Sequence, residues 1–443
     1  MKKSTYLIVL LFLCCSIFSA LPAQSNKENF ETLKKINEKV ILLLSEHKYS
    51  EITILFAPEL QMQLGSANLE QVWNMLNSKF GAYKSTGTSI EKVTAEKITA
   101  LTEINFENES FDLSTSLNEG GLLNSFNILP LSNKTPWLNP LYGQERNTKK
   151  TNINVGKVDP LLAELLSPKK DEKKAIIVFV HGSGPNDMDE TLGPNKFFKD
   201  LAYGLANRCI ASLRYKKRTY DYPVAMAKKQ FEITIDDEVT NDAVLAIQKA
   251  KSLGYKKIFL AGHSLGGHMA PKIADQERVD GVIILAGNSS PLVELLVPQF
   301  EYLFKNDSTS GITEFQLNAI KTQVETVISR KYDKDTHPMM LPLSMSAIYW
   351  KSLEDYLPIK IASKQKLPYL VLNGSRDYQV DVAQAKAWRN GNSNKFSRTR
   401  IFEGLNHMFI NGSGICLPTE YEKVGHVDLA VIEEIKNWIE GLN

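Results

Sequence analysis

The chain has 443 residues, of which 43% are hydrophobic and 23% are charged, a composition typical of a folded globular protein rather than a disordered one. Its formal net charge is +2, and leaving out Lys2 and Lys3, which lie in a segment that we expect to be removed, leaves 50 basic against 50 acidic residues. A chain so balanced has no electrostatic reason to bind nucleic acid or an acidic membrane surface.

Residues 1–23 have the pattern of a secretory signal peptide. Two lysines near the N-terminus are followed by the apolar stretch 6–17 and then by small residues. We expect cleavage after Ala23, with cleavage after Ala20 as the alternative. The sequence therefore predicts export, either to a periplasm or out of the cell.

Two other readings of this N-terminus concern the membrane. The apolar stretch is shorter than the ~20 residues that a membrane span needs, which argues against an anchor. A lipid on Cys14 or Cys15 is a further alternative, but the residues before them are not small. No later stretch is long and apolar enough to span, and after signal removal only Cys209 and Cys416 remain, either as one disulfide or as two free thiols.

The next part of the chain predicts a small α+β domain over residues 27–130. Apolar residues recur at a spacing of three to four through residues 27–80, which is typical of amphipathic helices. The segments 90–105, 108–117 and 121–129 are rich in Thr, Ile, Val and Phe and are separated by turn residues, as in a run of antiparallel strands.

Residues 131–150 contain prolines and a charged end, so we expect a linker there. Residues 151–443 then alternate between short apolar runs and amphipathic segments. This pattern predicts a mostly parallel sheet with helices on both faces. The strands are expected at 175–180, 258–261, 282–285 and 369–372, and the helices at 196–207, 237–252 and 265–274.

A helix-like stretch at 289–365 interrupts this alternation. Because insertions at the active edge of such a sheet often cover the site, we expect a cap, and additional packing is the alternative.

The strongest motif is Gly-His-Ser-Leu-Gly-Gly at 262–267, between a predicted strand and a predicted helix. It is typical of a nucleophile elbow, in which Ser264 sits on a tight turn and the flanking positions must be small. The amide of Leu265, at the start of the helix, would face a developing oxyanion. A plain structural turn is the alternative reading.

A second glycine-rich turn, at 181–185, directly follows the first buried strand. A turn at this edge can direct a second amide toward the same oxyanion. We expect the amide of Ser183 in this role, with Gly184 as the next candidate. His181 is expected to be structural.

The serine requires a base, and the base requires an acid that fixes its tautomer. His407 follows the strand-like segment 398–402, which is the position this chain order predicts. The other histidines after the serine fit less well, because His268 lies within the helix, His337 in the insertion and His426 at the start of the last helix.

Asp377 follows the apolar strand 369–372, so its loop ends at the same sheet edge as Ser264. Asp381 is the nearby competitor, and we expect it to cap the helix that begins there.

Five motifs in residues 151–443 resemble the α/β-hydrolase superfamily and, more narrowly, bacterial exported esterases similar to dienelactone hydrolase. They are HGSGPNDMDET (181–191), LRYKKRTY (213–220), GHSLGGHMAP (262–271), NGSRDYQV (373–380) and LNHMF (405–409). The resemblance implies the triad of Ser264, Asp377 and His407. Two positions depart from the pattern: Cys209 replaces an expected glycine, and Lys216 an expected acidic residue.

Members of that group often carry an N-terminal domain of NTF2-like α+β shape, and HKYSEITILFAPELQMQL with the later LEQVWNML resembles it. Gating of the pocket and formation of a homodimer are both open roles for this domain.

The resemblance implies hydrolysis of a small-molecule carboxylic ester through an acyl-enzyme, without a metal or organic cofactor. An acyltransferase or a peptidase with the same triad is the alternative, and a non-enzymatic binding protein is a third hypothesis.

Overall fold

The computed structural model describes residues 26–131, 137–308, 310–391 and 393–442. They form two compact units, one ending at residue 131 and the other beginning at residue 137. The predicted signal peptide lies outside the described residues. Within the described part, no helix has both the length and the apolar character needed to cross a membrane.

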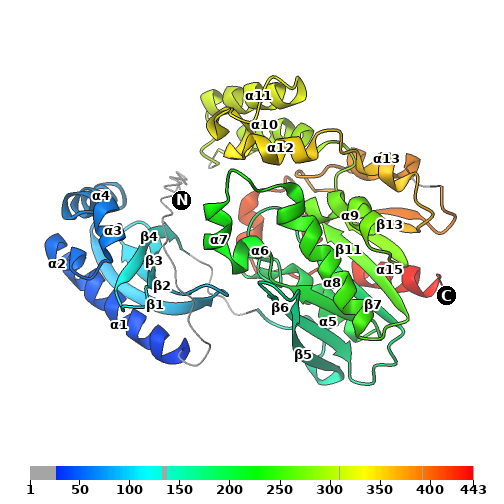
Figure 1. Cartoon of the computed structure of the whole chain (residues 1–443), viewed down its shortest axis with the longest axis horizontal. Helices are drawn as coiled ribbons and strands as arrows, with labels where there is room; N and C mark the ends of the chain where they lie inside the picture. Colours follow the sequence, from blue (N-terminus) through cyan, green and yellow to red (C-terminus); the bar gives the residue numbers. More distant parts are fainter. Residues whose placement is uncertain (1–25, 132–136, 309, 392, 443) are drawn as a thin grey trace. The chain divides into compact units, whose positions relative to one another are not determined.

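The N-terminal unit has four helices followed by a four-stranded antiparallel sheet with strand order β1-β2-β3-β4 (Figure 1). This confirms the expected α+β architecture. The elements are α1 (Asn26–Ser45), α2 (Tyr49–Thr53), α3 (Pro58–Gln63), α4 (Ser66–Phe80), β1 (Tyr83–Val93), β2 (Ile98–Phe106), β3 (Ser110–Leu117) and β4 (Leu123–Pro130).

The single strand expected at 90–105 was wrong, because a turn divides this segment between β1 and β2. The Thr94 hydroxyl accepts hydrogen bonds from the amides of Glu96 and Lys97, at 3.3 and 3.1 Å. A threonine side chain can thus satisfy the amides of a tight turn although its type is common in strands.

The core of this unit includes a buried hydrogen-bonded group that links a helix to the sheet. Asn37 of α1 is fully buried against the sheet. Its side-chain amide donates to Thr102 at 2.9 Å and accepts from Thr115 at 2.6 Å. Because both ends of the amide are satisfied, burying it costs little and fixes α1 on β2 and β3.

The C-terminal unit is built on an eight-stranded sheet with the order β14-β13-β12-β11-β7-β10-β6-β5. The six strands from β14 to β10 are parallel, whereas β5 and β6 form an antiparallel hairpin that pairs with β10. The strands are β5 (Thr148–Val155), β6 (Leu161–Pro168), β7 (Ala175–Val180), β10 (Ala211–Tyr215), β11 (Lys257–His263), β12 (Gly281–Leu285), β13 (Tyr369–Gly374) and β14 (Arg398–Phe402).

The expectation of a mostly parallel sheet is confirmed, but the β5–β6 hairpin was not foreseen. Its first residues, 148–150, belong to the segment that we expected to be a linker. The remaining elements are the short pair β8 (Thr191–Leu192) and β9 (Asn195–Lys196), with α5 (Phe197–Ala206), α6 (Arg218–Asp221), α7 (Pro223–Lys228), η2 (Asp236–Thr240), α8 (Asn241–Ser252), α9 (Leu265–Gln276), α14 (Val382–Ala387) and α15 (Leu429–Glu440).

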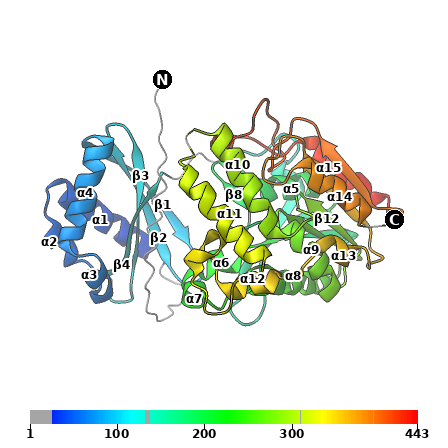
Figure 2. The same ribbon diagram turned by 90° about the horizontal axis from the view of Figure 1, so that it is seen from above.

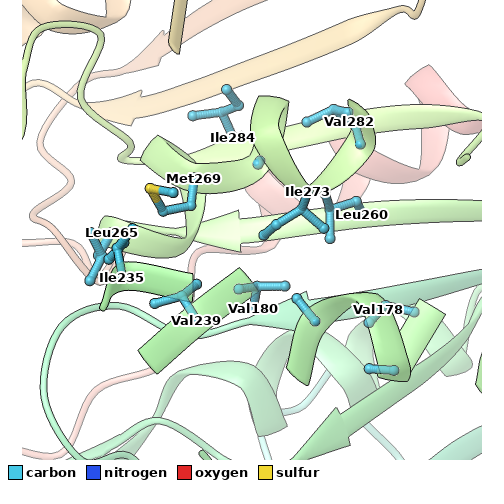
Figure 3. Packing of buried hydrophobic residues seen from close by; sticks show 14 of the residues in the cluster. Val178, Val180, Ile235, Val239, Leu260, Leu265, Met269, Ile273, Val282 and Ile284 are labelled. Atoms are coloured by element: carbon cyan, nitrogen blue, oxygen red, sulfur yellow. The ribbon is translucent and has the colours of Figure 1, made fainter. Parts of the chain in front are cut away.

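Helices cover both faces of the sheet, and β7 shows why. Its residues are buried throughout, and alternate side chains enter two different clusters: Val178 packs with residues of α8 and α9, and Ile177 with residues of α5 and α15. Figure 3 shows side chains of α9, among them Met269 and Ile273, lying against the strands on the first face. A strand covered on both faces needs no polar alternation, which is why these runs are wholly apolar.

The insertion between β12 and β13 is helical, as expected. It contains η3 (Leu292–Leu295), α10 (Leu296–Asn306), α11 (Glu314–Ile328), α12 (Ala347–Leu353) and α13 (Pro358–Ala362). Helices α10 and α11 lie side by side over the sheet-bearing part of this unit (Figure 2). The ring of Tyr302 stacks on Tyr378 with centroids 4.7 Å apart, and Gln299 donates to the carbonyl of Gln379 at 2.8 Å. The insertion is therefore attached to the loop that follows β13.

Candidate active site

Ser264 occupies a strained turn between β11 and α9. Its backbone angles are φ 51° and ψ −116°, a combination that side-chain-bearing residues rarely adopt. The turn is held because the amide of Ser264 donates to the carbonyl of Leu285 on the adjacent strand, at 2.9 Å. Ser264 remains partly exposed. A serine raised in this way above a sheet edge is accessible to a bound molecule.

The glycines around Ser264 are sterically required. A Cβ atom on Gly262 would overlap the carbonyl of Gly266, and one on Gly266 would overlap the carbonyl of Val180. Backbone atoms cannot move aside as a flexible side chain could. The expectation that small residues must flank the serine is confirmed.

The structure brings His407 and Asp377 together at the carboxyl edge of the sheet. They follow the parallel neighbours β14 and β13, and Nδ1 of His407 lies 2.7 Å from Oδ2 of Asp377. The other carboxylate oxygen of Asp377 accepts hydrogen bonds from the amides of Gln379 at 2.8 Å and Val380 at 3.0 Å. These amides fix the orientation of the carboxylate, which in turn orients the imidazole.

Ser264 follows β11, so it lies at the same edge as His407. The ring of its neighbour His263 packs 4.6 Å from the ring of His407, measured between centroids. Within the described residues the Ser264 hydroxyl has no hydrogen-bond partner. Catalytic hydrogen bonds are often long without a substrate and tighten when one binds.

The two amides that we expected to hold an oxyanion lie beside Ser264. Leu265 is the first residue of α9. The turn after β7 comes so close that a Cβ on Gly182 would be 3.2 Å from Cβ of Ser264, which places Ser183 next to the same spot. In the described part of the chain neither amide, of Leu265 or of Ser183, has an acceptor, so both are available to a bound group.

Comparisons with known proteins agree with this arrangement. Residues 173–289 match the family described as "Alpha/beta hydrolase domain". The chain is 31% identical over 399 residues to "Esterase EstD" of Thermotoga maritima, covering 89% of this chain and 92% of that protein. The chain belongs to the α/β-hydrolase family. In the N-terminal unit, residues 37–126 of this hydrolase match "Protein of unknown function (DUF3887)".

Solved structures of lower identity also resemble the hydrolase. The proline iminopeptidase of Mycobacterium smegmatis is 13% identical, with a TM-score of 0.42, and the match covers 66% of this chain and 98% of that one. Est1E of Butyrivibrio proteoclasticus, with ferulic acid bound, is 15% identical with a TM-score of 0.42 and covers 66% and 98%.

One buried acidic residue of the hydrolase, Glu190, was missed by the sequence analysis. Its Oε1 accepts a hydrogen bond from the amide of Gly182 at 2.6 Å and lies 3.1 Å from Nδ1 of His263. Burial opposes the charge on both side chains, but their mutual attraction outweighs it, so the pKa of Glu190 is lowered and that of His263 is raised. Each side chain therefore stabilises the charged form of the other. Glu190 lies within the motif at 181–191, but nothing in its sequence spacing from His263 indicates that the two residues pair.

A buried lysine, Lys217, was also given no role by the sequence analysis, which singled out its neighbour Lys216. Its ammonium group lies between the Gly182 carbonyl, at 2.9 Å, and a carboxylate oxygen of Glu238, at 2.5 Å. Both unforeseen residues thus contact Gly182, in the turn next to Ser264.

The other predicted histidines and acids lie in structural surroundings. The ring of His181 packs against Phe198 and Tyr215, and burial lowers its pKa to about 4. His268 is buried within α9, and burial lowers its pKa to about 4 as well. Asp381 accepts from the amide of Gln384 and caps α14, as expected.

The remaining candidates have other partners. Nδ1 of His337 accepts from the amide of Met339 in the insertion, and His426 lies near Asp200. Cys209 and Cys416 are both free thiols, the first exposed and the second buried.

Proposed function

We propose that this hydrolase cleaves a small-molecule carboxylic ester through an acyl-enzyme on Ser264. The observation that carries the proposal is a serine on a strained elbow at the sheet edge where His407 and Asp377 are hydrogen bonded at 2.7 Å. The relative from Thermotoga maritima bears the name of an esterase, which supports the same reaction class.

In the first step the Ser264 oxygen attacks the ester carbonyl while His407 takes the hydroxyl proton on Nε2. Asp377 accepts a hydrogen bond from Nδ1, so the unprotonated nitrogen is the one left for the serine. The imidazolium that forms is stabilised by the buried carboxylate. His407 then gives the proton to the departing alcohol, and water releases the acid by the reverse sequence.

The negative charge that develops on the carbonyl oxygen needs donors that are already in place. We assign this role to the amides of Leu265 and Ser183. Removal of one such donor typically costs about 2.7–4 kcal/mol in transition-state energy. Because both donors belong to the backbone, side-chain substitutions at these positions do not remove them.

Hydrolysis of p-nitrophenyl acetate by the wild type and by Ser264→Ala tests the proposal. We expect the variant to lose at least about 10³-fold in kcat/KM, and a fluorophosphonate to label the peptide that contains Ser264. Ser252→Ala, at the exposed end of α8, is the matched control and should behave as the wild type. Equal rates for wild type and Ser264→Ala, or a label on another residue, would contradict the proposal.

The same assay separates hydrolysis from related reactions. Products formed with added alcohols would indicate an acyltransferase, and cleavage of peptides in preference to esters would indicate a peptidase.

We also propose that the protein is exported by a signal peptide at residues 1–23. Cell fractionation and N-terminal sequencing of the mature protein test this, and the expected first residue is Gln24. A cytoplasmic protein that retains residues 1–23 would contradict it.

A further inference from the structure

The buried ammonium group of Lys217 is unusual because lysine side chains are rarely removed from water. Its side chain is only 3% exposed, and it follows β10. The ion pair with Glu238 accounts for the burial, since an unpaired buried charge would be strongly destabilising. The second contact, to the neutral carbonyl of Gly182 at 2.9 Å, is the one that reaches the candidate active site.

The Gly182 carbonyl shares a peptide plane with the amide of Ser183. In a trans peptide the C=O and N–H bonds point in opposite directions, and the described chain has no cis peptide bond. Holding the carbonyl therefore fixes the direction of the Ser183 amide. A cation on the carbonyl oxygen also polarises the peptide and strengthens its N–H as a donor.

We propose that Lys217 is a positioning residue for the oxyanion hole, which it orients through the Gly182–Ser183 peptide. The proposal rests on the serine esterase function proposed above. The preceding amide, that of Gly182, is held separately by Glu190 at 2.6 Å. The turn is thus held on one side by an anion and on the other by a cation. The Asn186 side-chain amide also donates to the Gly182 carbonyl, at 3.3 Å, but Lys217 supplies the shorter contact and the only charge on the peptide that carries the Ser183 amide.

The ion pair also connects this peptide to the helical insertion. The second carboxylate oxygen of Glu238 accepts a hydrogen bond from the hydroxyl of Tyr349 in α12, at 2.8 Å. One helical turn further on, Ser352 accepts from the amide of Ile235 at 2.9 Å, just before η2, which carries Glu238. A displacement of α12 would therefore disturb Glu238 and, through Lys217, the oxyanion donor.

The Tyr349 hydroxyl is suited to this role because it stays protonated. Burial and the neighbouring Glu238 raise the pKa of Tyr349 well above its usual value, so the hydroxyl keeps its proton and donates near neutral pH.

The test uses the full chain with Lys217→Met combined with Glu238→Gln. The double variant removes the cation but leaves no unpaired buried charge, and the glutamine oxygen can still accept from Tyr349. Lys216→Met combined with Asp221→Asn is the matched control, because it removes the neighbouring lysine together with its buried partner and likewise leaves no unpaired charge. Circular dichroism and thermal unfolding establish that each variant is folded.

Two readouts separate positioning from a merely structural role. The first is p-nitrophenyl acetate kinetics, in which we expect kcat to fall about 10–100-fold with KM nearly unchanged. This fall is smaller than that expected when a whole oxyanion donor is removed. The second is inhibition by a trifluoromethyl ketone. The carbonyl carbon of this inhibitor bonds to the Ser264 oxygen, the C=O π bond opens to an oxyanion and the hydroxyl proton passes to His407. The affinity of the inhibitor therefore reports on the oxyanion hole and should fall in parallel with kcat.

A folded double variant with wild-type kcat and wild-type inhibitor affinity would overturn the proposal. If the double variant does not fold, Tyr349→Phe decides instead. This variant keeps the ion pair between Lys217 and Glu238 but removes the hydrogen bond that Glu238 accepts from α12. We expect kcat to fall about 3–10-fold at constant KM. A wild-type kcat would overturn the proposal. If the wild type itself shows no ester hydrolysis that depends on Ser264, the esterase function is refuted. The failure of that function and the failure of the Lys217 proposal are therefore distinguishable.

Discussion

Nε2 of His263 lies 3.1 Å from the backbone carbonyl oxygen of His407, so the residue before the proposed nucleophile supports the residue proposed as its base. The other ring nitrogen of His263 lies 3.1 Å from Glu190, which also holds the amide of Gly182. One buried ion pair thereby connects three of the turns that form the candidate active site: the elbow, the loop of His407 and the turn after β7.

Replacement of Glu190 by glutamine should destabilise the fold in a pH-dependent way. Because the pKa of Glu190 is lowered in the folded protein, its carboxylate stabilises the fold above pH 4.5, the pKa of an unfolded glutamate. This stabilisation is lost as the pH falls through the pKa of the folded state. Because the pKa of His263 is raised in the folded protein, its stabilisation of the fold is fully present below pH 6.5, the pKa of an unfolded histidine. It is lost as the pH rises through the pKa of the folded state. We therefore expect the largest loss, about 1.5–3 kcal/mol, between these two values.

Urea unfolding of the wild type and Glu190→Gln over a pH series measures this loss. Glu277→Gln is the control, because that carboxylate pairs with Lys251 near the surface and should contribute under about 1 kcal/mol. A loss for Glu190→Gln that is the same at every pH would show that the pair is not ionised.

Asp377→Asn should lower kcat by about 10³–10⁴-fold while the protein stays folded. The amides of Gln379 and Val380 would hold the asparagine oxygen where Oδ1 now lies. The asparagine NH₂ group would then face Nδ1 of His407, which stabilises the tautomer with its proton on Nε2. That tautomer cannot accept the serine proton.

Steady-state kinetics with p-nitrophenyl acetate check this prediction for Asp377→Asn. Asp381→Asn is the control, since asparagine also caps helices well and Asp381 only caps α14. A near-wild-type rate for Asp377→Asn would mean that the carboxylate does not set the tautomer.

Gly266→Ala should destabilise the hydrolase unit by more than about 3 kcal/mol. The added Cβ would overlap the carbonyl of Val180 and approach that of His181, and backbone atoms cannot yield without distorting β7. Denaturant unfolding measures the effect. Gly441→Ala in the same unit, where the added carbon would make only ordinary contacts at 3.4 Å and beyond, should leave stability nearly unchanged. Equal stability of both variants would show that the elbow can relax.

The residues that were predictable from sequence are those whose position follows from local order along the chain. Ser264 and Asp377 follow apolar runs, His407 follows the strand-like segment 398–402, and parallel strands bring such positions to one edge. Glu190 and Lys217 were not predictable, because their partners lie in other elements and the reason for their burial appears only when the turn at Gly182 is seen.

The β5–β6 hairpin was missed for a related reason. Its first strand is largely exposed and carries lysines and asparagines, so it has no apolar run. Its position is determined by pairing with β6, which in turn pairs with β10. Edge strands of this kind are specified by their neighbours more than by their own composition.

Cys209→Gly should stabilise the hydrolase, because Cys209 occupies a position that favours glycine. Its φ of 63° is left-handed. The amide of Cys209 donates to the carbonyl of Ala206 at 3.2 Å, and that of Ile210 to the carbonyl of Leu205 at 3.0 Å, which is the paired bonding of a Schellman motif at the end of α5. A side chain in this conformation costs about 1–2 kcal/mol. Glycine removes that cost but loses some entropy on folding, so we expect a net gain of about 0.5–1 kcal/mol.

Urea unfolding of Cys209→Gly and Cys209→Ser separates backbone strain from the loss of the thiol. Both variants remove the exposed sulfur, but serine keeps a Cβ atom, so only the glycine variant should gain stability. The kinetics of ester hydrolysis should stay at the wild-type level in both, since the turn before β10 contributes no group to the proposed mechanism. If the serine variant gained as much as the glycine variant, the strain at this position would not be the cause, and the thiol itself would be the destabilising group.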